Sequence, residues 1–220
     1  MSFLNIFYFF VFYSFLGWLI ESTFVSISQK RFVNRGFLDG PFCPIYGFGA
    51  LTIILFVFPF HRQFLLFFLM SILVTSFIEY FTSWFFEKFF NVSWWNYSNK
   101  PLNINGRICL ENCLYWGILS VLVLSFIHPY IIPLANFLSL YLGFFGVFLF
   151  TIYFIIDATD TFYILIEFKK MISQKISDNI HLDKKLVRLI KNFPNFRSKI
   201  NNDFVNELKA RLNIKRYIKK

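Results

Sequence analysis

The sequence predicts an all-α, polytopic membrane helix bundle with about five transmembrane helices and a helical, basic tail. Of its 220 residues, 57% are hydrophobic and 35 are phenylalanine, whereas soluble domains are roughly 45–50% apolar. Its mean hydropathy is +0.56. Apolar stretches of about 20 residues, the length that crosses a bilayer, recur along the chain. Charge is also unevenly placed, because residues 168–220 hold 15 Lys or Arg against four Asp or Glu.

This charge distribution divides the chain into two parts. We expect residues 1–167 to form a transmembrane domain and residues 168–220 a basic amphipathic cytoplasmic tail. The first apolar stretch has no Lys or Arg before it and is long for a signal peptide, so we expect it to be a retained span. The basic pI belongs to the tail, and we expect no nucleic-acid partner.

Five apolar stretches fit membrane-spanning helices. They cover about residues 3–27, 46–60, 64–86, 110–127 and 133–166. The second is short for a crossing, and a re-entrant segment is the alternative interpretation. The last exceeds one bilayer thickness, so we expect it to project into the cytoplasm as a continuous helix.

The positions of Lys and Arg predict the orientation. Residues 30–35 and 88–107 hold three each, whereas the loop after the second stretch has only Arg62 and the loop at His128–Pro133 has none. The positive-inside rule then places the N-terminus outside and the C-terminus inside, in a multi-pass protein of the cell membrane. The bias toward Phe, Ile, Asn and Lys is typical of an AT-rich bacterial genome.

The tail contains two stretches with helical spacing of apolar residues. Pro194 would end the first helix and Asp203 would cap the second. Such helices either lie on anionic membrane lipid or form a docking surface for a cytoplasmic partner. Their apolar stripes are Leu186, Ile190 and Phe193, and Phe204, Leu208 and Leu212.

Carboxylates inside the predicted spans are the first candidates for function, because a charge within a bilayer is costly. In the first span, Ser14, Gly17 and Glu21 form a small, polar face suited to close helix approach. Asp157 and Asp160 lie one turn apart in the last span. A longer polar strip in the third span consists of Ser71, Thr75, Glu79, Ser83 and Glu87.

These acids differ in their expected roles. We expect Glu21 and Glu79 to face the bundle interior, in a functional role or an ion pair. We expect Glu87, Asp160 and Glu167 to lie at the interface, with their carboxylates reaching water.

The predicted inner loops supply partners for these acids. Residues 34–47 contain several Gly and Pro residues among apolar ones, which indicates bent backbone that re-enters the protein or the interface. Arg107 precedes Glu111 by four residues, so a local ion pair is expected there. Arg35, Arg107, Asn34, Asn103 and Asn105 are expected to face Glu21, Glu79 and Asp157. The simpler interpretation is that Arg–Glu pairs only hold the bundle together.

Motifs of soluble enzymes are missing from the sequence. It has no P-loop, G-x-S-x-G, H-E-x-x-H or CxxC pattern, so the chain is not expected to bind ATP itself. Cys109 and Cys113 lie four residues apart without further ligands nearby, and we expect packing rather than a metal there. We expect no cofactor, and the pattern favours a non-enzyme without deciding the question.

Three blocks of sequence resemble a known family. Gly17-Trp18 with Glu21, residues 34–47, and residues 94–117 together resemble the family Putative ABC-transporter type IV, whose members are CmpB-like permeases. Asn96 and Cys113 depart from the pattern, where an acid and a small hydroxyl residue would be expected. The resemblance implies a transport permease that works with a separate ABC-type ATPase, and five spans per chain favour a homodimer.

Three functions follow as hypotheses. The first is a permease subunit with a polar cavity facing the cytoplasm. The alternatives are a membrane-embedded enzyme acting on a lipid or phosphate-bearing substrate at the cytoplasmic leaflet, and a non-catalytic membrane scaffold or regulator. The candidate binding or pathway residues are Glu21, Asn34, Arg35, Glu79, Asn105, Arg107, Glu111 and Asp157.

Overall fold

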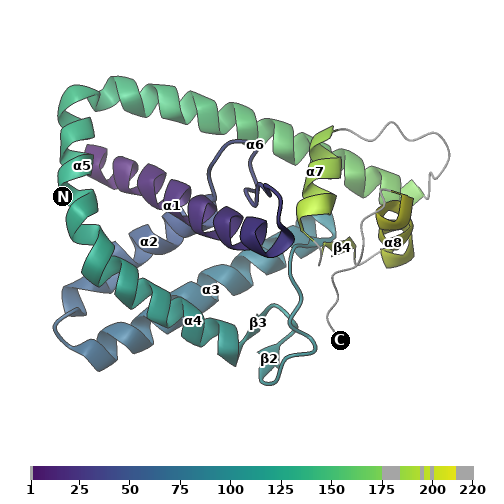
Figure 1. The fold of residues 1–220 in the computed structure, drawn as a ribbon, viewed down its shortest axis with the longest axis horizontal. Helices are drawn as coiled ribbons and strands as arrows, with labels where there is room; N and C mark the ends of the chain where they lie inside the picture. Colours follow the sequence, from purple (N-terminus) through teal and green to yellow (C-terminus); the bar gives the residue numbers. More distant parts are fainter. Residues whose placement is uncertain (1, 175–183, 194–195, 199–200, 212–220) are drawn as a thin grey trace.

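The computed structural model describes residues 2–174, 184–193, 196–198 and 201–211, which form a helical bundle with small paired strands (Figure 1). Its helices are α1 (Phe3–Gln29), α2 (Pro44–Phe56), α3 (Phe64–Phe90), α4 (Leu110–Leu122), α5 (His128–Tyr141), α6 (Gly143–Gln174), α7 (Lys184–Asn192) and α8 (Asn202–Arg211). A 3₁₀ turn, η1 (Phe58–Phe60), and a π-helical turn, η2 (Val123–Ile127), join some of them. The strands are β1 (Val92–Ser93), β2 (Asn103–Ile104), β3 (Ile108–Cys109) and β4 (Arg197–Ser198).

Local chemistry sets the ends of the long helices. The Ser2 side chain accepts a hydrogen bond from the backbone N–H of Asn5 at 3.2 Å and caps α1. Lys30 and Asn91, with φ of 51° and 57°, adopt the left-handed conformation that ends α1 and α3. Gly143 has φ of 49° and makes the sharp turn into α6, a conformation that glycine adopts without steric cost.

Within the described residues, four helices are long and apolar enough to cross a membrane. They are α1, α3, the continuous run Leu110–Tyr141 and Gly143–Ile172 of α6. The remaining predicted span, α2, has 13 residues. At 1.5 Å per residue it is about 20 Å long, against a hydrocarbon core of about 30 Å. The structure therefore supports a helical membrane protein with four long helices and one short apolar one.

The connection predicted at His128–Pro133 is wrong. Helix α4 passes through η2 into α5 without leaving the helical conformation, and Pro133 lies inside α5. Pro129, which has no backbone N–H to donate, lies just after the π-helical turn η2, so the break in the regular hydrogen-bond pattern lies beside this proline. The chain instead turns between α5 and α6 at Gly143, so the last long helix begins about ten residues later than predicted.

Charged loops and the tail gather at one end of the bundle. Figure 1 shows α7, α8, β2, β3 and β4 at the right of the view, with the N-terminus and α5 at the left. β2 pairs with β3 within residues 103–109, and β1 pairs antiparallel with β4, so the tail is joined to the segment after α3. The segments with the predicted excess of Lys and Arg therefore share one end.

The tail forms the two predicted helices, but their apolar faces are not available to lipid. Leu189 and Phe204 belong to a buried cluster that also contains Phe86, Trp94 and Leu165 from the membrane helices and their connection. The interpretation of a tail lying on lipid through its apolar stripe is therefore wrong for the described residues.

The second tail helix is also capped differently from the prediction. The Asn201 side chain accepts a hydrogen bond from the backbone N–H of Phe204 at 3.0 Å, and Asp203 lies in the first turn of α8. Pro194 and Leu212, which the sequence interpretation used, lie outside the described residues.

Candidate functional site

Close packing of α1 on α2 positions the first predicted acid. A Cβ atom added to Gly17 would lie 2.2 Å from Cγ of Tyr46, and one added to Gly47 would lie 2.3 Å from Oγ of Ser14. Only glycine at both positions allows this approach. The predicted small face of α1 is therefore a helix-packing face, and it brings Glu21 to the start of α2.

Glu21 lies between loop 1 (residues 30–43) and α2. Its carboxylate accepts hydrogen bonds from Arg35 Nε at 3.2 Å and from the Tyr46 hydroxyl at 2.7 Å. The Arg35 guanidinium also donates to the backbone carbonyl of Asn192 at 2.5 Å and lies 4.2 Å from the ring centre of Phe193. The expected contact between Arg35 and Glu21 is present. Through its contacts with Asn192 and Phe193, Arg35 also joins loop 1 to the tail.

Loop 1 is folded around Asn34. Its side-chain oxygen accepts hydrogen bonds from the Trp18 indole and the Gly36 backbone N–H, both at 2.8 Å, and its amide donates to the Asp39 carbonyl. A Cβ on Gly36 would lie 2.9 Å from the Leu38 carbonyl oxygen, so the tight bend requires glycine. The bent backbone predicted for this loop is therefore observed, and Asn34 has a structural role in it.

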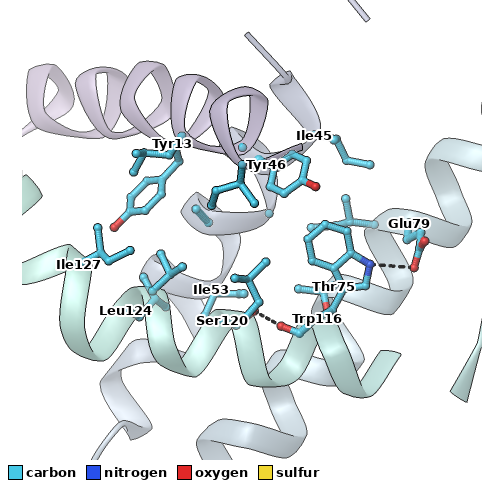
Figure 2. Close-up of a pocket in the computed structure, with 18 residues that line it drawn as sticks. Tyr13, Ile45, Tyr46, Ile53, Thr75, Glu79, Trp116, Ser120, Leu124 and Ile127 are labelled. Carbon is cyan, nitrogen blue, oxygen red and sulfur yellow. Dashed lines mark hydrogen bonds between the residues drawn. The ribbon is translucent and has the colours of Figure 1, made fainter. Parts of the chain in front are cut away.

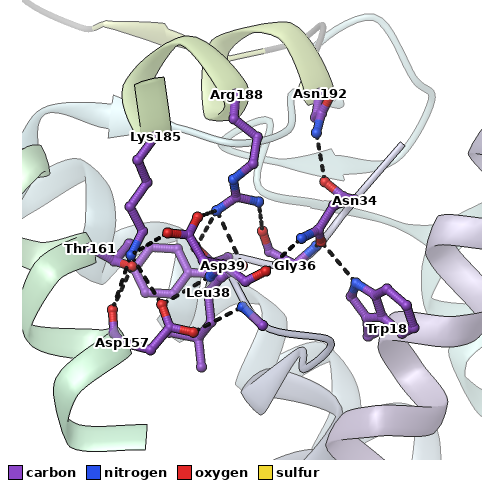
Figure 3. Close-up of polar contacts among 12 residues, drawn as sticks. Trp18, Asn34, Gly36, Leu38, Asp39, Asp157, Thr161, Lys185, Arg188 and Asn192 are labelled. Atoms are coloured by element: carbon purple, nitrogen blue, oxygen red, sulfur yellow. Dashed lines mark hydrogen bonds and ion pairs between the residues drawn. The ribbon is translucent and has the colours of Figure 1, made fainter. Parts of the chain in front are cut away.

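Helix α7 clamps loop 1 through residues that sequence reasoning missed (Figure 3). Lys185 Nζ lies 3.0 Å from carboxylate oxygens of both Asp39 and Asp157. Arg188 lies 2.8 Å from Asp39 and donates to the Gly36 carbonyl at 3.0 Å. Burial lowers the pKa of the Arg188 guanidinium, and the two carboxylates oppose that shift. Lys185 and Arg188 are three residues apart, which places both cations on one face of α7. The acids that they bind lie far away in the sequence, so the spacing gave no sign of these pairs.

Asp157 therefore faces the tail rather than Arg35 or Arg107. Besides Lys185, its carboxylate accepts hydrogen bonds from the backbone N–H groups of Asp39 and Gly40, both at 2.9 Å. This close approach requires glycine at position 40, because a Cβ there would collide with the Tyr153 hydroxyl. Asp157 is thus an anchor for loop 1 on α6.

Glu79 lies deep in the polar strip of α3, and neutral groups surround it. Its carboxylate accepts hydrogen bonds from the Tyr97 hydroxyl at 3.1 Å, the Trp116 indole at 3.1 Å and the Asn112 amide at 2.8 and 3.0 Å. Within the described chain it forms no ion pair with Arg35 or with any other Lys or Arg. Burial and the Glu79 charge raise the pKa of the Tyr97 phenol, which stays a hydrogen-bond donor at neutral pH.

Arg107 binds none of the acids that the sequence suggested for it, which were Glu21, Glu79, Glu111 and Asp157. It lies 2.6 Å from Glu87, and that pair is buried, with 13% and 6% of the two side chains exposed. Glu87 is therefore not at a water-exposed interface. Asn105 and Arg107 both donate to the Tyr80 hydroxyl, at 3.0 and 2.8 Å. Arg107 precedes α4 and so lacks the helical geometry needed to reach Glu111.

Glu111 is peripheral to this arrangement. It pairs with Lys100 at 2.7 Å, and about half of each side chain is exposed, at 45% and 50%. Such surface pairs contribute little to stability. Asn103 donates to the carbonyls of Ser98 and Lys100 and shapes its own loop.

Two cavities meet at the start of α2. The Glu79 cavity, about 80 Å³, lies among α1, α2, α3 and α4, with Tyr46, Glu79 and Trp116 in its wall (Figure 2). The Arg35 cavity, about 590 Å³, is mostly apolar and includes Glu21, Arg35 and Phe154. Ile45 and Tyr46 line both cavities and separate them. The sequence indicated the acids of these cavities but not the aromatic pair formed by Tyr46 and Trp116. These two residues lie far apart in the sequence, so no spacing rule brings them together.

The described cysteines and potential metal ligands are dispersed. Among the described residues, no three His, Cys, Asp or Glu side chains lie together as a potential metal site. Cys43, Cys109 and Cys113 are free and buried. Burial raises the pKa of the Cys43 thiol to about 12, with a further contribution from the Glu21 charge, so it is unreactive at neutral pH.

Comparison with known protein families matches residues 8–162 to the family described as Putative ABC-transporter type IV. The chain belongs to this family. The match covers well over half of the 220 residues and extends from α1 into α6. No curated protein and no solved structure matches the chain.

Membership of this transporter-type family agrees with the architecture. The apolar helices and the family together support a membrane protein with a transport-related role. Glu21, Arg35, Glu79, Arg107 and Asp157 all fall within the matched residues. The cations of α7 lie beyond residue 162, so the clamp on loop 1 is made by a part of this chain that follows the family match.

Proposed function

We propose that this chain is the permease subunit of a membrane transporter driven by a separate ABC-type ATPase. Its family membership and its long apolar helices support this function. In this proposal the end that gathers loop 1, residues 91–109 and the tail faces the cytoplasm, because these segments hold most of the Lys and Arg. The N-terminus is then outside, and a homodimer provides a wider body than one chain does.

The observation that carries this proposal is the wall shared by the two cavities. Tyr46 lines both, and its hydroxyl is held by Glu21 at 2.7 Å. A movement of Tyr46, together with the neighbouring Ile45, would join the Arg35 cavity, near the loop 1 end, to the Glu79 cavity inside the bundle. A permease requires a path whose access can be opened and closed, and this arrangement would provide one.

Contacts with the tail suggest where an ATPase would act. Loop 1 is held by Lys185, Arg188 and Asn192 of α7, and Arg35 of the same loop holds Glu21. A partner that displaced α7 would therefore act on the residue that fixes Tyr46. This arrangement gives a physical route from the cytoplasmic surface to the wall between the cavities.

The two alternative functions have less support from the contacts. A lipid- or phosphate-processing enzyme would need Arg35 or Arg107 for an anionic group, but both are engaged by carboxylates, Glu21 and Glu87. A scaffold that docks partners through the tail would need its apolar stripe, but Leu189 and Ile190 are fully buried within the chain.

The test is purification of the tagged chain from its own cells in lipid nanodiscs, with mass spectrometry of the proteins that accompany it. We expect a stoichiometric P-loop ATPase whose ATP hydrolysis changes when the chain is present. The matched comparison is Lys185→Met against Lys184→Met, because Lys185 is buried in the clamp and Lys184 is exposed. Loss of the ATPase with the first variant alone, at a temperature at which that variant remains folded, locates its docking at α7 and loop 1. A chain that carries no ATPase under conditions that preserve its fold contradicts the permease proposal.

A further inference from the structure

The Glu79 cavity has an unusual charge balance. Among the described residues in its wall, Glu79 is the one charged group, and most of the others are aliphatic, such as Ile53, Ile78 and Leu124. Its side chain is 5% exposed, and no described Lys or Arg pairs with it. A negative charge in an apolar cavity attracts a positive ligand strongly, because little solvent screens it.

The hydrogen bonds of Glu79 restrict what that ligand can be. A carboxylate has about four acceptor positions. Asn112, Tyr97 and Trp116 make four hydrogen-bond contacts with the two oxygens, at 2.8 to 3.1 Å. A ligand that enters the cavity therefore finds the charge of the carboxylate, with its acceptor positions largely occupied by three protein donors. A primary ammonium, which must lose its hydration and satisfy three N–H donors, is poorly matched to this site.

Aromatic rings supply the second half of the site. The rings of Tyr46 and Trp116 have centroids 5.1 Å apart at an interplanar angle of 60°, and Tyr13 also lines the cavity. Figure 2 shows the Tyr46 and Trp116 rings close to each other, with the Trp116 indole directed at Glu79. Ring faces attract cations that need no hydrogen bond, and recognition of quaternary ammonium groups by aromatic residues is the known use of this effect.

We propose that the Glu79 cavity binds a quaternary ammonium group in preference to a primary amine. This inference rests on the proposed function in that it names the substrate class of the same cavity. The cavity of about 80 Å³ has room for several waters, at roughly 10–15 Å³ each, or for one small organic cation. The Glu79 carboxylate provides the charge, and the aromatic rings provide the contact surface. Because the carboxylate oxygens already accept hydrogen bonds from the protein, the N–H groups of a primary amine find few acceptors there.

Calorimetric titration of the chain in nanodiscs made without choline lipids tests this. Tetramethylammonium chloride is expected to bind at least about ten-fold more tightly than methylammonium chloride. Glu79→Gln is expected to abolish binding, whereas Asp160→Asn, which removes an exposed carboxylate of α6, leaves it unchanged. Trp116→Phe is expected to weaken it, with Trp84→Phe as the matched control. Equal binding of the two cations, or undiminished binding by Glu79→Gln, overturns the proposal.

A second variant keeps the test valid if Glu79→Gln does not fold. Asn112→Leu removes two of the four contacts to the carboxylate and frees acceptor positions. We expect the preference for tetramethylammonium over methylammonium to narrow or reverse, and an unchanged preference overturns the argument from occupied acceptors. Competition by phosphatidylcholine added to the disc identifies a lipid headgroup as the source of the quaternary group, and no competition identifies a free solute.

This experiment is separable from the test of the permease function. A chain that couples to an ATPase but binds no tetramethylammonium retains the proposed function and loses this substrate class. A chain that binds the cation but carries no ATPase retains the site and loses the transporter role.

Discussion

Lys185→Met is the substitution whose effect follows most directly from the structure. It removes the cation from a buried pair in which 8% of Lys185 and 9% of Asp157 are exposed. Removing one partner of a buried pair costs roughly 3–5 kcal/mol. Asp157 keeps two backbone N–H donors at 2.9 Å, and Asp39 is half exposed, so its lost pair adds little. We expect a loss at the lower end, about 3 kcal/mol in the free energy of unfolding.

A thiol-reactive dye measures this loss during heating. The chain contains three cysteines, Cys43, Cys109 and Cys113, which are 5%, 2% and 8% exposed, so the dye reacts as the protein unfolds. The raised pKa of the Cys43 thiol keeps the folded-state reaction slow near neutral pH. A loss of about 3 kcal/mol corresponds to a fall in Tm of about 6–12 °C for a chain of this size.

Two comparisons decide whether the reasoning is correct. Lys184→Met changes the exposed neighbour and is expected to leave Tm within about 1 °C of the parent. Adding Asp157→Asn to Lys185→Met removes the unpaired charge, so the double variant is expected to recover part of the loss. If Lys185→Met unfolds at the same temperature as Lys184→Met, the buried clamp does not stabilise the chain and the account of α7 is refuted.

Two other stability predictions use the same dye assay. Arg107→Met leaves the Glu87 carboxylate buried without its cation and is expected to cost roughly 3–5 kcal/mol, and a neutral result would mean that Glu87 reaches water. Gly17→Ala places a methyl group 2.2 Å from Cγ of Tyr46, so α1 and α2 must separate at a cost of roughly 1–3 kcal/mol. Gly49→Ala, with nothing within 4 Å of the added Cβ, is the control and is expected to leave stability unchanged or raise it by up to about 1 kcal/mol, because alanine favours the helix.

Periodicity predicted the helices and their buried faces well. The α3 strip of Ser71, Thr75, Glu79, Ser83 and Glu87 lies on one helix face, as its four-residue spacing indicated, and that face is buried even at Glu87, where the sequence predicted contact with water. Such predictions succeed because the side chains on one helix face are fixed by local geometry alone.

Pairings between distant segments were predicted poorly. Arg35–Glu21 was one of several pairings that the sequence left open between the inner-loop residues and the acids. Arg107 was assigned to Glu111 by a helical rule, but α4 begins only at Leu110, so the rule does not apply. Its actual partner, Glu87, belongs to another helix, and only the fold brings the two together.

The tail shows how a local pattern can be misread. Lys and Arg on an amphipathic helix normally form a solvated face. Here Lys185 and Arg188 point at Asp39 and Asp157, which lie about 150 and 30 residues away in sequence and gave no local signal. Likewise, Pro133 indicated a loop and the start of the last span, but it is accommodated within α5. For the tail cations, tertiary contacts decide the outcome, and such contacts are not encoded in short-range spacing.

The wall between the cavities provides a last prediction, on accessibility rather than stability. Ser120 lines the Glu79 cavity, and Tyr46 separates that cavity from the one near loop 1. In a background with the native cysteines replaced by alanine, Ser120→Cys is expected to react slowly with a membrane-impermeant thiol reagent. Tyr46→Ala removes the wall and is expected to accelerate the reaction at least about ten-fold, whereas Tyr46→Phe removes only the hydrogen bond to Glu21 and is expected to give a smaller increase. Equal rates in all three backgrounds would mean that Tyr46 does not control access, and the substrate path would then have to avoid α2 altogether.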